Sequence, residues 1–185
     1  MSQTQANLLK AFTGESMARN KYTFYAQQAR KEGFEWLARV FEETADNERA
    51  HAEREYEHLQ GKVEMTNTYN LHSLQNTLKN LKDAAAGEKY EWSSMYPDFE
   101  QTARQENQLK IARVFKEIAE VEEKHEERYI ILAKLLEDGG LYKSAQPIEW
   151  KCLNCGYIHK GTSAPKACPA CNKPQGLYMQ LKIVR

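Results

Sequence analysis

The chain has 185 residues, enough for one sizeable domain or for a domain with a small module attached. Its 26 basic and 26 acidic side chains cancel, so no overall field attracts nucleic acid or a membrane surface, and we expect neither as a partner. No run of about 18 apolar residues occurs. The N-terminus lacks the basic and apolar order of a secretory signal, which predicts a cytoplasmic protein.

Helical patterning fills the chain from about residue 3 to residue 137, and we expect four long helices there. They are predicted at 3–31, 35–60, 71–95 and 98–137, with a polar link at 61–70. Pro97 is interpreted as the end or a bend of the third helix, because proline lacks an N–H and disfavours helix just before it. Apolar stripes, such as Leu74, Leu78 and Leu81 on the third helix, predict an all-α four-helix bundle.

A change of composition after residue 140 predicts a second unit. We expect a bundle domain at 1–140, a linker at 141–147 and a small domain at 148–185. All the cysteines lie in this last part, as two Cys-x-x-Cys pairs with 12 residues between them: Cys152, Cys155, Cys168 and Cys171. Without an export signal, two such pairs indicate a tetrahedral metal site rather than disulfides. So short a segment needs the ion in order to fold. Taken alone, the pattern is more often a zinc site than an iron site.

Two Glu-x-x-His motifs interrupt the apolar stripes of the second and fourth helices. They are Glu48 with His51 and Glu122 with His125, and residues three apart lie on one face of a helix. Two such pairs on facing helices, with a further glutamate from each remaining helix, are the ligand pattern of di-iron and di-manganese bundles. A single motif is commonly a surface pair, but two copies that each break a core stripe favour a metal site.

The two motifs belong to an internal repeat with an offset of 74 residues. The sequence Ala-Arg-Val-Phe precedes each motif at that offset. Upstream, Glu15 matches Glu88 at an offset of 73, whereas Tyr22 matches Tyr96 at 74, so the second copy has gained one residue between them. We therefore expect two similar helix pairs around a pseudo-twofold axis, with both upstream glutamates facing one site.

A core that contains these side chains requires cations. Each buried, unpaired carboxylate costs at least several kcal/mol, and several together repel one another, whereas two divalent ions nearly balance them. Oxygen and imidazole ligands suit iron or manganese better than zinc, and two adjacent redox ions can deliver two electrons to one O–O bond. The predicted ligands are Glu15, Glu48, His51, Glu88, Glu91, Glu122 and His125.

The repeat is imperfect at one candidate ligand. Glu91 follows Glu88 by three residues, but Ala18 stands at the corresponding place after Glu15. The two metal positions therefore cannot be identical. We hypothesise that the ion held by Glu15 exchanges the carboxylate of Glu91 for the imidazole of His51; the alternative is that Glu91 is a surface residue.

Tyr22 and Tyr96 follow the upstream glutamates by about two helical turns. Each is either a core aromatic or a hydrogen-bond donor to a ligand carboxylate or to bound peroxide. With Glu91 and His51, they are the candidate catalytic residues.

With these motifs the chain closely resembles rubrerythrins along nearly its whole length. The resemblance rests on Gly14-Glu15-Ser16 with Ala18-Arg19-Asn20, on Gly87-Glu88 with Met95-Tyr96-Pro97, on both Glu-x-x-His pairs and on the cysteine knuckles. It implies a ferritin-like bundle with a non-haem di-iron site and a rubredoxin-like domain whose four cysteines hold one iron. It further implies homodimers in which the iron–thiolate centre of one subunit lies near the di-iron site of its partner. Larger or helix-swapped assemblies stay open.

The implied activity is that of a peroxidase active in oxidative-stress protection. Hydrogen peroxide is reduced to water with electrons from NADH, which redox proteins such as rubredoxin or a flavoprotein reductase pass on. Two alternatives stay open: a ferroxidase or iron-storage protein of the ferritin-like class, and a non-catalytic scaffold with zinc among the cysteines. Glu91 and the cysteine domain argue against storage, because storage needs no dedicated electron inlet.

Overall fold

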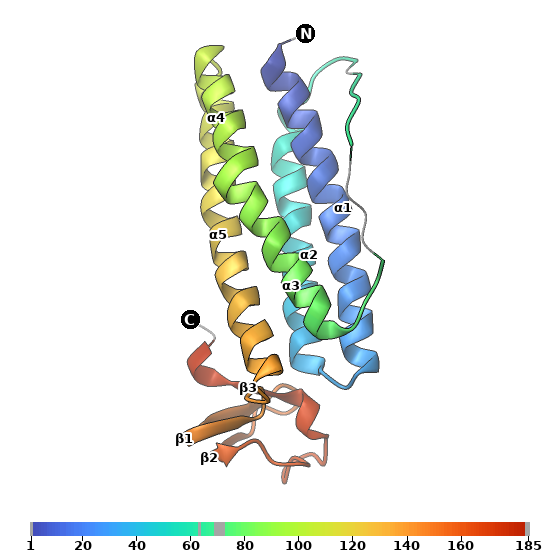
Figure 1. Cartoon of the computed structure of the whole chain (residues 1–185), viewed down its shortest axis with the longest axis vertical. Coiled ribbons are helices and arrows are strands. Elements are labelled where there is room, and N and C mark those ends of the chain that lie inside the picture. Colours follow the sequence, from blue (N-terminus) through green and yellow to red (C-terminus); the bar gives the residue numbers. More distant parts are fainter. Residues whose placement is uncertain (1, 63, 69–72, 184–185) are drawn as a thin grey trace.

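The computed structural model describes residues 2–62, 64–68 and 73–183. A helical bundle stands on a small three-stranded sheet (Figure 1). The helices are α1 (Gln3–Lys31), α2 (Glu35–Tyr56), α3 (Thr77–Tyr90), α4 (Tyr96–Gln105) and α5 (Leu109–Glu137). A π-helical turn, Glu91–Met95, joins α3 to α4, so these segments form one long helix and the predicted four-helix bundle is confirmed. Among the described residues, no helix combines the length and the apolar character needed to cross a membrane.

The helices form two hairpins that lie side by side. α1 and α2 make the first hairpin, and the long helix α3–α4 makes the second with α5 (Figure 1). α2 ends far from the sheet and α3 begins near it, so the chain between them must cross the length of the bundle. A single long crossover of this kind is a feature of ferritin-like bundles.

The predicted bounds of three helices are wrong. The second helix ends at Tyr56, four residues before its predicted end. The predicted start of the third helix, residue 71, lies outside the described residues, and α3 begins at Thr77 after the N-cap Asn76. Leu74, predicted on the inner face, precedes the helix and is exposed. Pro97 does not end the helix, because the π turn before it changes the hydrogen-bond pattern at the point where the missing N–H falls.

The predicted fourth helix, 98–137, is in fact interrupted at a tight turn. Asn107 has a φ of 58°, and there Gln108 N–H donates to the carbonyl of Ala103 at 2.8 Å. Asn107 N–H donates to the carbonyl of Arg104 at 3.1 Å, which completes a Schellman motif. Gly33, 74 residues earlier, has a φ of 83° and ends α1 in the same way. The sequence analysis missed this turn because asparagine, not glycine, holds the left-handed position.

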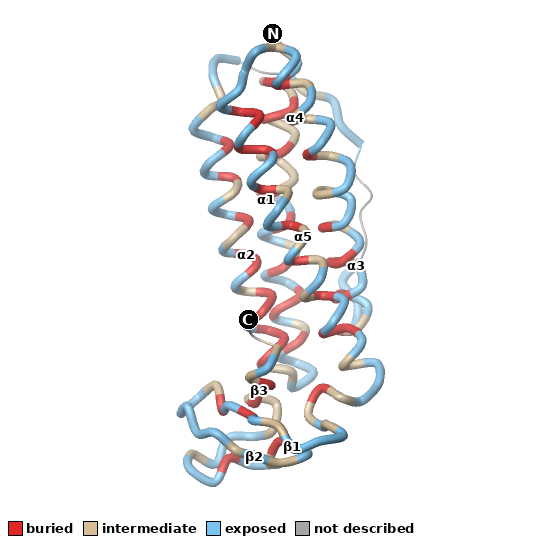
Figure 2. The backbone as a smooth tube through the Cα atoms, turned by 90° about the vertical axis from the view of Figure 1, so that its left-hand side faces the viewer, coloured by how far each residue is buried: buried red, intermediate tan, exposed pale blue. Residues whose placement is uncertain are grey.

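Two apolar cores fill the bundle, and a layer of acidic and imidazole side chains separates them. Along α5, Ile118 belongs to one core and Tyr129 to the other, with Glu122 and His125 between them. α1 repeats this order around Glu15. Buried positions accordingly run along the inner side of every helix (Figure 2). The two cores therefore enclose a polar layer at mid-height.

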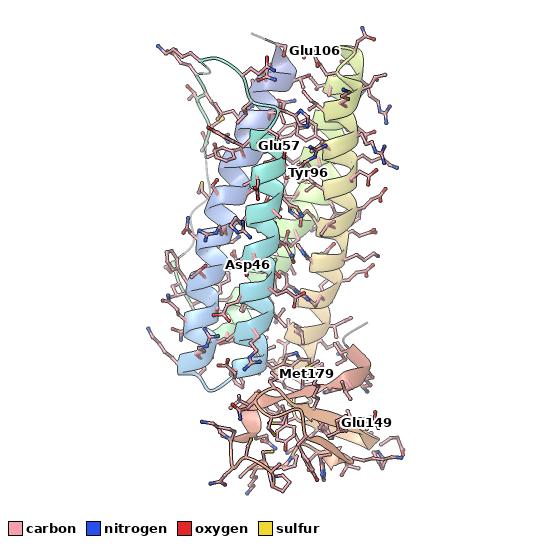
Figure 3. All side chains as sticks on the ribbon, turned by 180° about the vertical axis from the view of Figure 1, so that it is seen from behind. Asp46, Glu57, Tyr96, Glu106, Glu149 and Met179 are labelled. Atoms are coloured by element: carbon pink, nitrogen blue, oxygen red, sulfur yellow. The ribbon has the colours of Figure 1, made fainter. Side chains whose placement is uncertain are left out.

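The small domain packs against the end of its own bundle. Its strands are β1 (Lys143–Cys152), β2 (Ile158–Ser163) and β3 (Tyr178–Gln180), in the antiparallel order β2-β1-β3. β1 therefore begins inside the segment predicted as a linker. Met179 lies at the junction and belongs to the nearer bundle core (Figure 3). Gln180 donates to the carbonyl of Gly140 at 2.9 Å, and Arg39 donates to the carbonyl of Leu153 at 3.0 Å.

Gly176 contacts the α1–α2 turn so closely that an added Cβ would overlap the carbonyl oxygen of Gly33. We expect Gly176→Ala to displace the small domain and to lower the free energy of unfolding by about 1–3 kcal/mol, the usual cost of overpacking. Urea denaturation measures the change. The control is Gly14→Ala, because its added Cβ meets no atom within 4 Å and alanine favours a helix interior. Equal stability of both variants would contradict the close docking.

Candidate metal centre

The two Glu-x-x-His pairs face each other in the polar layer. The Nδ1 atom of His51 lies 3.0 Å from Glu48 Oε2 and 2.8 Å from Glu122 Oε1. The Nδ1 atom of His125 lies 2.7 Å from Glu122 Oε2 and 3.4 Å from Glu48 Oε1. Each of these two carboxylates thus turns one oxygen towards each histidine. This arrangement allows both carboxylates to contact two ions at once.

The upstream glutamates complete two groups of ligands. Glu15 on α1 lies 4.0 Å from Nδ1 of His51, and Glu88 on α3 lies 4.0 Å from Nδ1 of His125. The ligand atoms of each group lie within 4.8 Å of one another, and the groups are Glu15, Glu48, His51 and Glu122, and Glu48, Glu88, Glu122 and His125. The groups share the two central carboxylates. The structure therefore brings together every predicted bundle ligand except Glu91.

Glu91 begins the π turn and lies outside both groups. Burial, together with the charges of Glu122 and Glu48, nevertheless raises the pKa of Glu91 to about 8, so its carboxyl lies close to the site. One extra residue in an α-helix produces a π turn, and the second copy of the repeat gained its residue between Glu88 and Tyr96. The insertion thus forms the π turn that begins at Glu91, while leaving Glu88 and Tyr96 facing inward.

Each buried tyrosine contacts a ligand carboxylate of the other repeat. The Tyr22 hydroxyl on α1 donates to Glu88 Oε1, and the Tyr96 hydroxyl on α4 donates to Glu15 Oε1. Both side chains are almost inaccessible to solvent. Of the two interpretations offered for these tyrosines, the contacts favour donors to ligand carboxylates. Through them, each hairpin orients a ligand of the other.

Burial and mutual repulsion dominate the electrostatics of the layer. Burial, followed by the charge of Glu48, raises the pKa values of Glu15 and Glu88 well above the usual range. Burial acts to lower the pKa values of His51 and His125, but hydrogen bonds to the shared carboxylates raise them to about 10 and about 9. Burial acts to raise the pKa of Glu48, but hydrogen bonds to both histidines lower it to about 2. Without cations, the layer must therefore hold protons.

The site has the orphaned acceptors expected of a metal centre. Among the described residues, Glu15 Oε2 and Glu88 Oε2 are buried without a hydrogen-bond partner. The two Glu122 oxygens and Glu48 Oε1 face only the ring nitrogens of the two histidines. A buried acceptor left unpaired costs about 1–3 kcal/mol, and more when it is charged. Two cations between the shared carboxylates satisfy these atoms together. The mixed oxygen and imidazole donor set fits iron.

Glu55 is a buried carboxyl that the sequence analysis missed. It is fully inaccessible to solvent, and its Oε1 lies 3.1 Å from the Tyr96 hydroxyl. One signal was available: Glu55 follows Glu48 by two helical turns and so lies on the same face of α2. Its counterpart in the second copy is Tyr129, so the two copies share no acidic residue at this position and their comparison does not single out Glu55.

The four cysteines converge in the small domain. Sγ–Sγ distances are 3.8 Å between Cys152 and Cys171 and 3.7 Å between Cys155 and Cys168, and none of the four is in a disulfide. Sulfurs placed tetrahedrally about 2.3 Å from an ion lie about 3.8 Å apart, so the geometry fits a bound metal. Matching turns build the two knuckles, with N–H groups donating to the first cysteine's carbonyl from Gly156 at 2.9 Å and Asn172 at 2.8 Å.

Comparison with known proteins agrees with both metal sites. A family model described as rubrerythrin matches residues 6–133, and one described as the rubredoxin-like domain of rubrerythrin matches residues 150–178. The chain belongs to the rubrerythrin family. The rubrerythrin of Porphyromonas gingivalis is 46% identical over 98% of this chain and 91% of its own length. That of Nitratidesulfovibrio vulgaris is 43% identical over 98% of this chain and 96% of its own.

Solved structures of similar sequence share the fold of this chain. Nigerythrin in a mixed-valence state superposes with a TM-score of 0.66 at 35% identity, covering 97% of this chain and 86% of that one. Fully reduced, all-ferrous nigerythrin gives a TM-score of 0.65 at 35% identity, covering 97% and 87%. Rubrerythrins are in general oxidoreductases that remove peroxide with a di-iron carboxylate site. The predicted family, the ferritin-like and rubredoxin-like fold, and the cofactors, two irons plus one thiolate-bound iron, are confirmed.

Loading the bundle site with two ferrous ions should release several protons. The raised pKa values of His51 and His125 mean that both hold protons at pH 7 that an ion must displace. The pKa values of Glu15 and Glu88 are also raised, so these carboxyl groups lose their protons less readily than free ones when an ion binds. This competition weakens as the pH rises, so the apparent affinity for ferrous ion should increase from about pH 6 to about pH 8. Anaerobic calorimetry in two buffers of different ionisation enthalpy measures the proton count. Binding without proton release and with pH-independent affinity would contradict this account.

Proposed function

We propose that this protein reduces hydrogen peroxide to water at the bundle site and is re-reduced through its iron–thiolate centre. The electrons come ultimately from NADH, through a redox protein such as rubredoxin or a flavoprotein reductase. The observation that carries the proposal is the pair of ligand groups that share Glu48 and Glu122, in one chain with a four-thiolate site. When bound, the iron pair supplies the two electrons that cleave one O–O bond.

The ligand roles follow from the contacts. Glu48 and Glu122 would be shared by the two ions, because each turns one oxygen towards each histidine. Glu15 and Glu88 are terminal ligands, each held by a tyrosine hydroxyl from the other hairpin. The tyrosine hydroxyls hold the terminal carboxylates in orientation and can donate protons to them.

His51 and Glu91 are proposed to alternate as ligands beside Glu15. His51 lies in the ligand group of Glu15, whereas Glu91 lies just outside on the π turn. The Trp92 indole N–H donates to Glu126 Oε2 at 2.6 Å, which ties that turn to α5. The second metal position has no such alternative carboxylate, because Ala18 occupies the place equivalent to Glu91.

We also propose a homodimer in which the iron–thiolate centre of one subunit serves the di-iron site of its partner. Within one chain the small domain meets α2 near Arg39, whereas Glu48 stands nine residues further along that helix. At the helical rise of 1.5 Å per residue, the axial separation along α2 is about 14 Å. This separation within one chain supports transfer between subunits.

Peroxide stoichiometry tests the proposed activity. One hydrogen peroxide added to the anaerobically reduced protein should rapidly oxidise one iron pair, because the pair supplies both electrons. Stopped-flow spectroscopy follows the oxidation and its end point. Slow, substoichiometric oxidation, or a cage-sized oligomer that collects a mineral core, would instead indicate iron storage.

Loss of the thiolate centre should leave a single turnover with peroxide intact and abolish repeated turnover. Cys155→Ser removes one sulfur ligand at an exposed position and leaves the bundle untouched. We expect the variant, once chemically reduced, to react with peroxide as the wild type does, because the bundle ligands are intact. Its NADH-linked steady-state turnover should fall to background. Unchanged steady-state turnover would show that electrons enter elsewhere. Protein with zinc in the cysteine site, which keeps four ligands but cannot be reduced, is the matched control.

A further inference from the structure

Tyr96 lies between two carboxyl groups, and its single hydroxyl proton can form a hydrogen bond to only one of them at a time. Its Oη contacts Glu15 Oε1 and lies 3.1 Å from Glu55 Oε1. A tyrosine hydroxyl donates one hydrogen bond and takes part in a second only as an acceptor. An ionised carboxylate has no proton to donate. One of the two carboxyl groups must therefore be a neutral acid.

The surroundings identify which carboxyl group holds the proton. Glu15 belongs to a ligand group, and a ligand carboxylate is ionised when its ion is bound. Glu55 belongs to neither group and is fully inaccessible to solvent. Burial raises its pKa well above the usual range, although the hydrogen bond with Tyr96 and the charge of His51 act in the opposite direction. The donors therefore run in one direction, from Glu55 to the Tyr96 oxygen and from the Tyr96 hydroxyl to Glu15.

We propose that Glu55 is the proton-holding end of a relay that directs the hydroxyl proton of Tyr96 at Glu15 and replaces it once it has been passed on. Glu55 reaches the reacting atoms only through Tyr96, so it is a positioning residue. The catalytic role of the relay rests on the proposed peroxide reduction. The hydrogen-bond geometry is independent of that proposal.

The second half of the repeat shows that the relay belongs to one metal position. There Tyr22 donates to Glu88 as Tyr96 does to Glu15. The place equivalent to Glu55 holds Tyr129, whose ring centroid lies 5.6 Å from that of Tyr22. The Glu88 half thus has an aromatic ring behind its tyrosine where the Glu15 half has an acid. Proton supply is accordingly directed to the Glu15 half.

The two protons of the step come from the relay and from solvent water. Reduction of one hydrogen peroxide to two waters consumes two electrons and two protons. Tyr96 gives its hydroxyl proton to Glu15 Oε1, where it is available to the substrate oxygen. The O–H bond of Glu55 breaks and a new O–H bond forms on Tyr96. Glu55 is left as a carboxylate and regains its proton from water. The relay supplies one of the two protons.

Titratable groups from α1, α2, α4, α5 and the π turn surround Glu55. They are Glu15 from α1, His51 from α2, Glu91 from the π turn, Tyr96 from α4 and Glu122 from α5. The neighbouring carboxylates disfavour ionisation of Glu55, whereas His51 favours it when protonated.

Infrared spectroscopy of the iron-loaded protein tests the protonation state without any turnover. Glu55→Gln keeps the shape and a donor N–H towards Tyr96 but has no acid proton. The wild-type minus Glu55→Gln difference spectrum at pH 7 should contain the C=O stretch of a neutral carboxylic acid, shifted in D₂O. Carboxylate stretches in its place would show that Glu55 is ionised and would overturn the proposal.

Single-turnover kinetics with peroxide test the relay. Oxidation of reduced Glu55→Gln should be slower by about 10²-fold, at the low end of what a positioned proton donor contributes. Tyr129→Phe removes a hydroxyl at the equivalent place and should leave the rate unchanged. A Glu55→Gln rate equal to that of wild type would overturn the relay, because the variant keeps the hydrogen bond and lacks only the proton. A wild-type protein inert to peroxide would refute the proposed function, while the infrared result would still report on Glu55.

Discussion

Burial of a carboxylate layer between two apolar cores is the constraint on which the rest of this structure depends. Charged groups at such a depth cost several kcal/mol each unless an opposite charge is present, and the glutamates outnumber the histidines there. Two cations between Glu48 and Glu122 remove both the repulsion and the unpaired acceptors. The repeated hairpins, the crossed tyrosine contacts and the shared carboxylates all serve to hold that layer together.

Departures from twofold symmetry make the two metal positions different. The inserted residue widens one turn into a π turn, and that turn begins at Glu91, where the first copy has Ala18. Glu55 replaces an aromatic ring of the other half and lies behind Tyr96. Beyond the effect of burial, both extra carboxyl groups raise the pKa of Glu15, and Glu91 also forms a hydrogen bond with Glu88. The symmetric part of the site fits two ions, whereas the asymmetric part is proposed to give one of them an alternative ligand and a proton supply.

Features with a strong local cause were predictable from the sequence. Each Glu-x-x-His pair breaks an apolar stripe, and the cysteine spacing admits few structures, so both metal sites were found. Asn107 was missed because few residues signal a left-handed turn as clearly as glycine, although the repeat places it opposite Gly33. Pro97 misled because its effect depends on the neighbouring π turn. Glu55 and the docking of Gly176 depend on tertiary contacts between distant segments, and no local pattern encodes these.

The free energy of unfolding with and without iron tests the central claim most directly, using the double variant Glu15→Gln, Glu88→Gln. Both carboxyls have folded-state pKa values raised by burial, so at pH 7 they destabilise the metal-free protein relative to its unfolded chain, where they ionise freely. The account predicts that the neutral amides stabilise the metal-free protein and destabilise the iron-loaded one. A change of the same sign in both forms would contradict the claim that bound cations compensate this buried acidic layer.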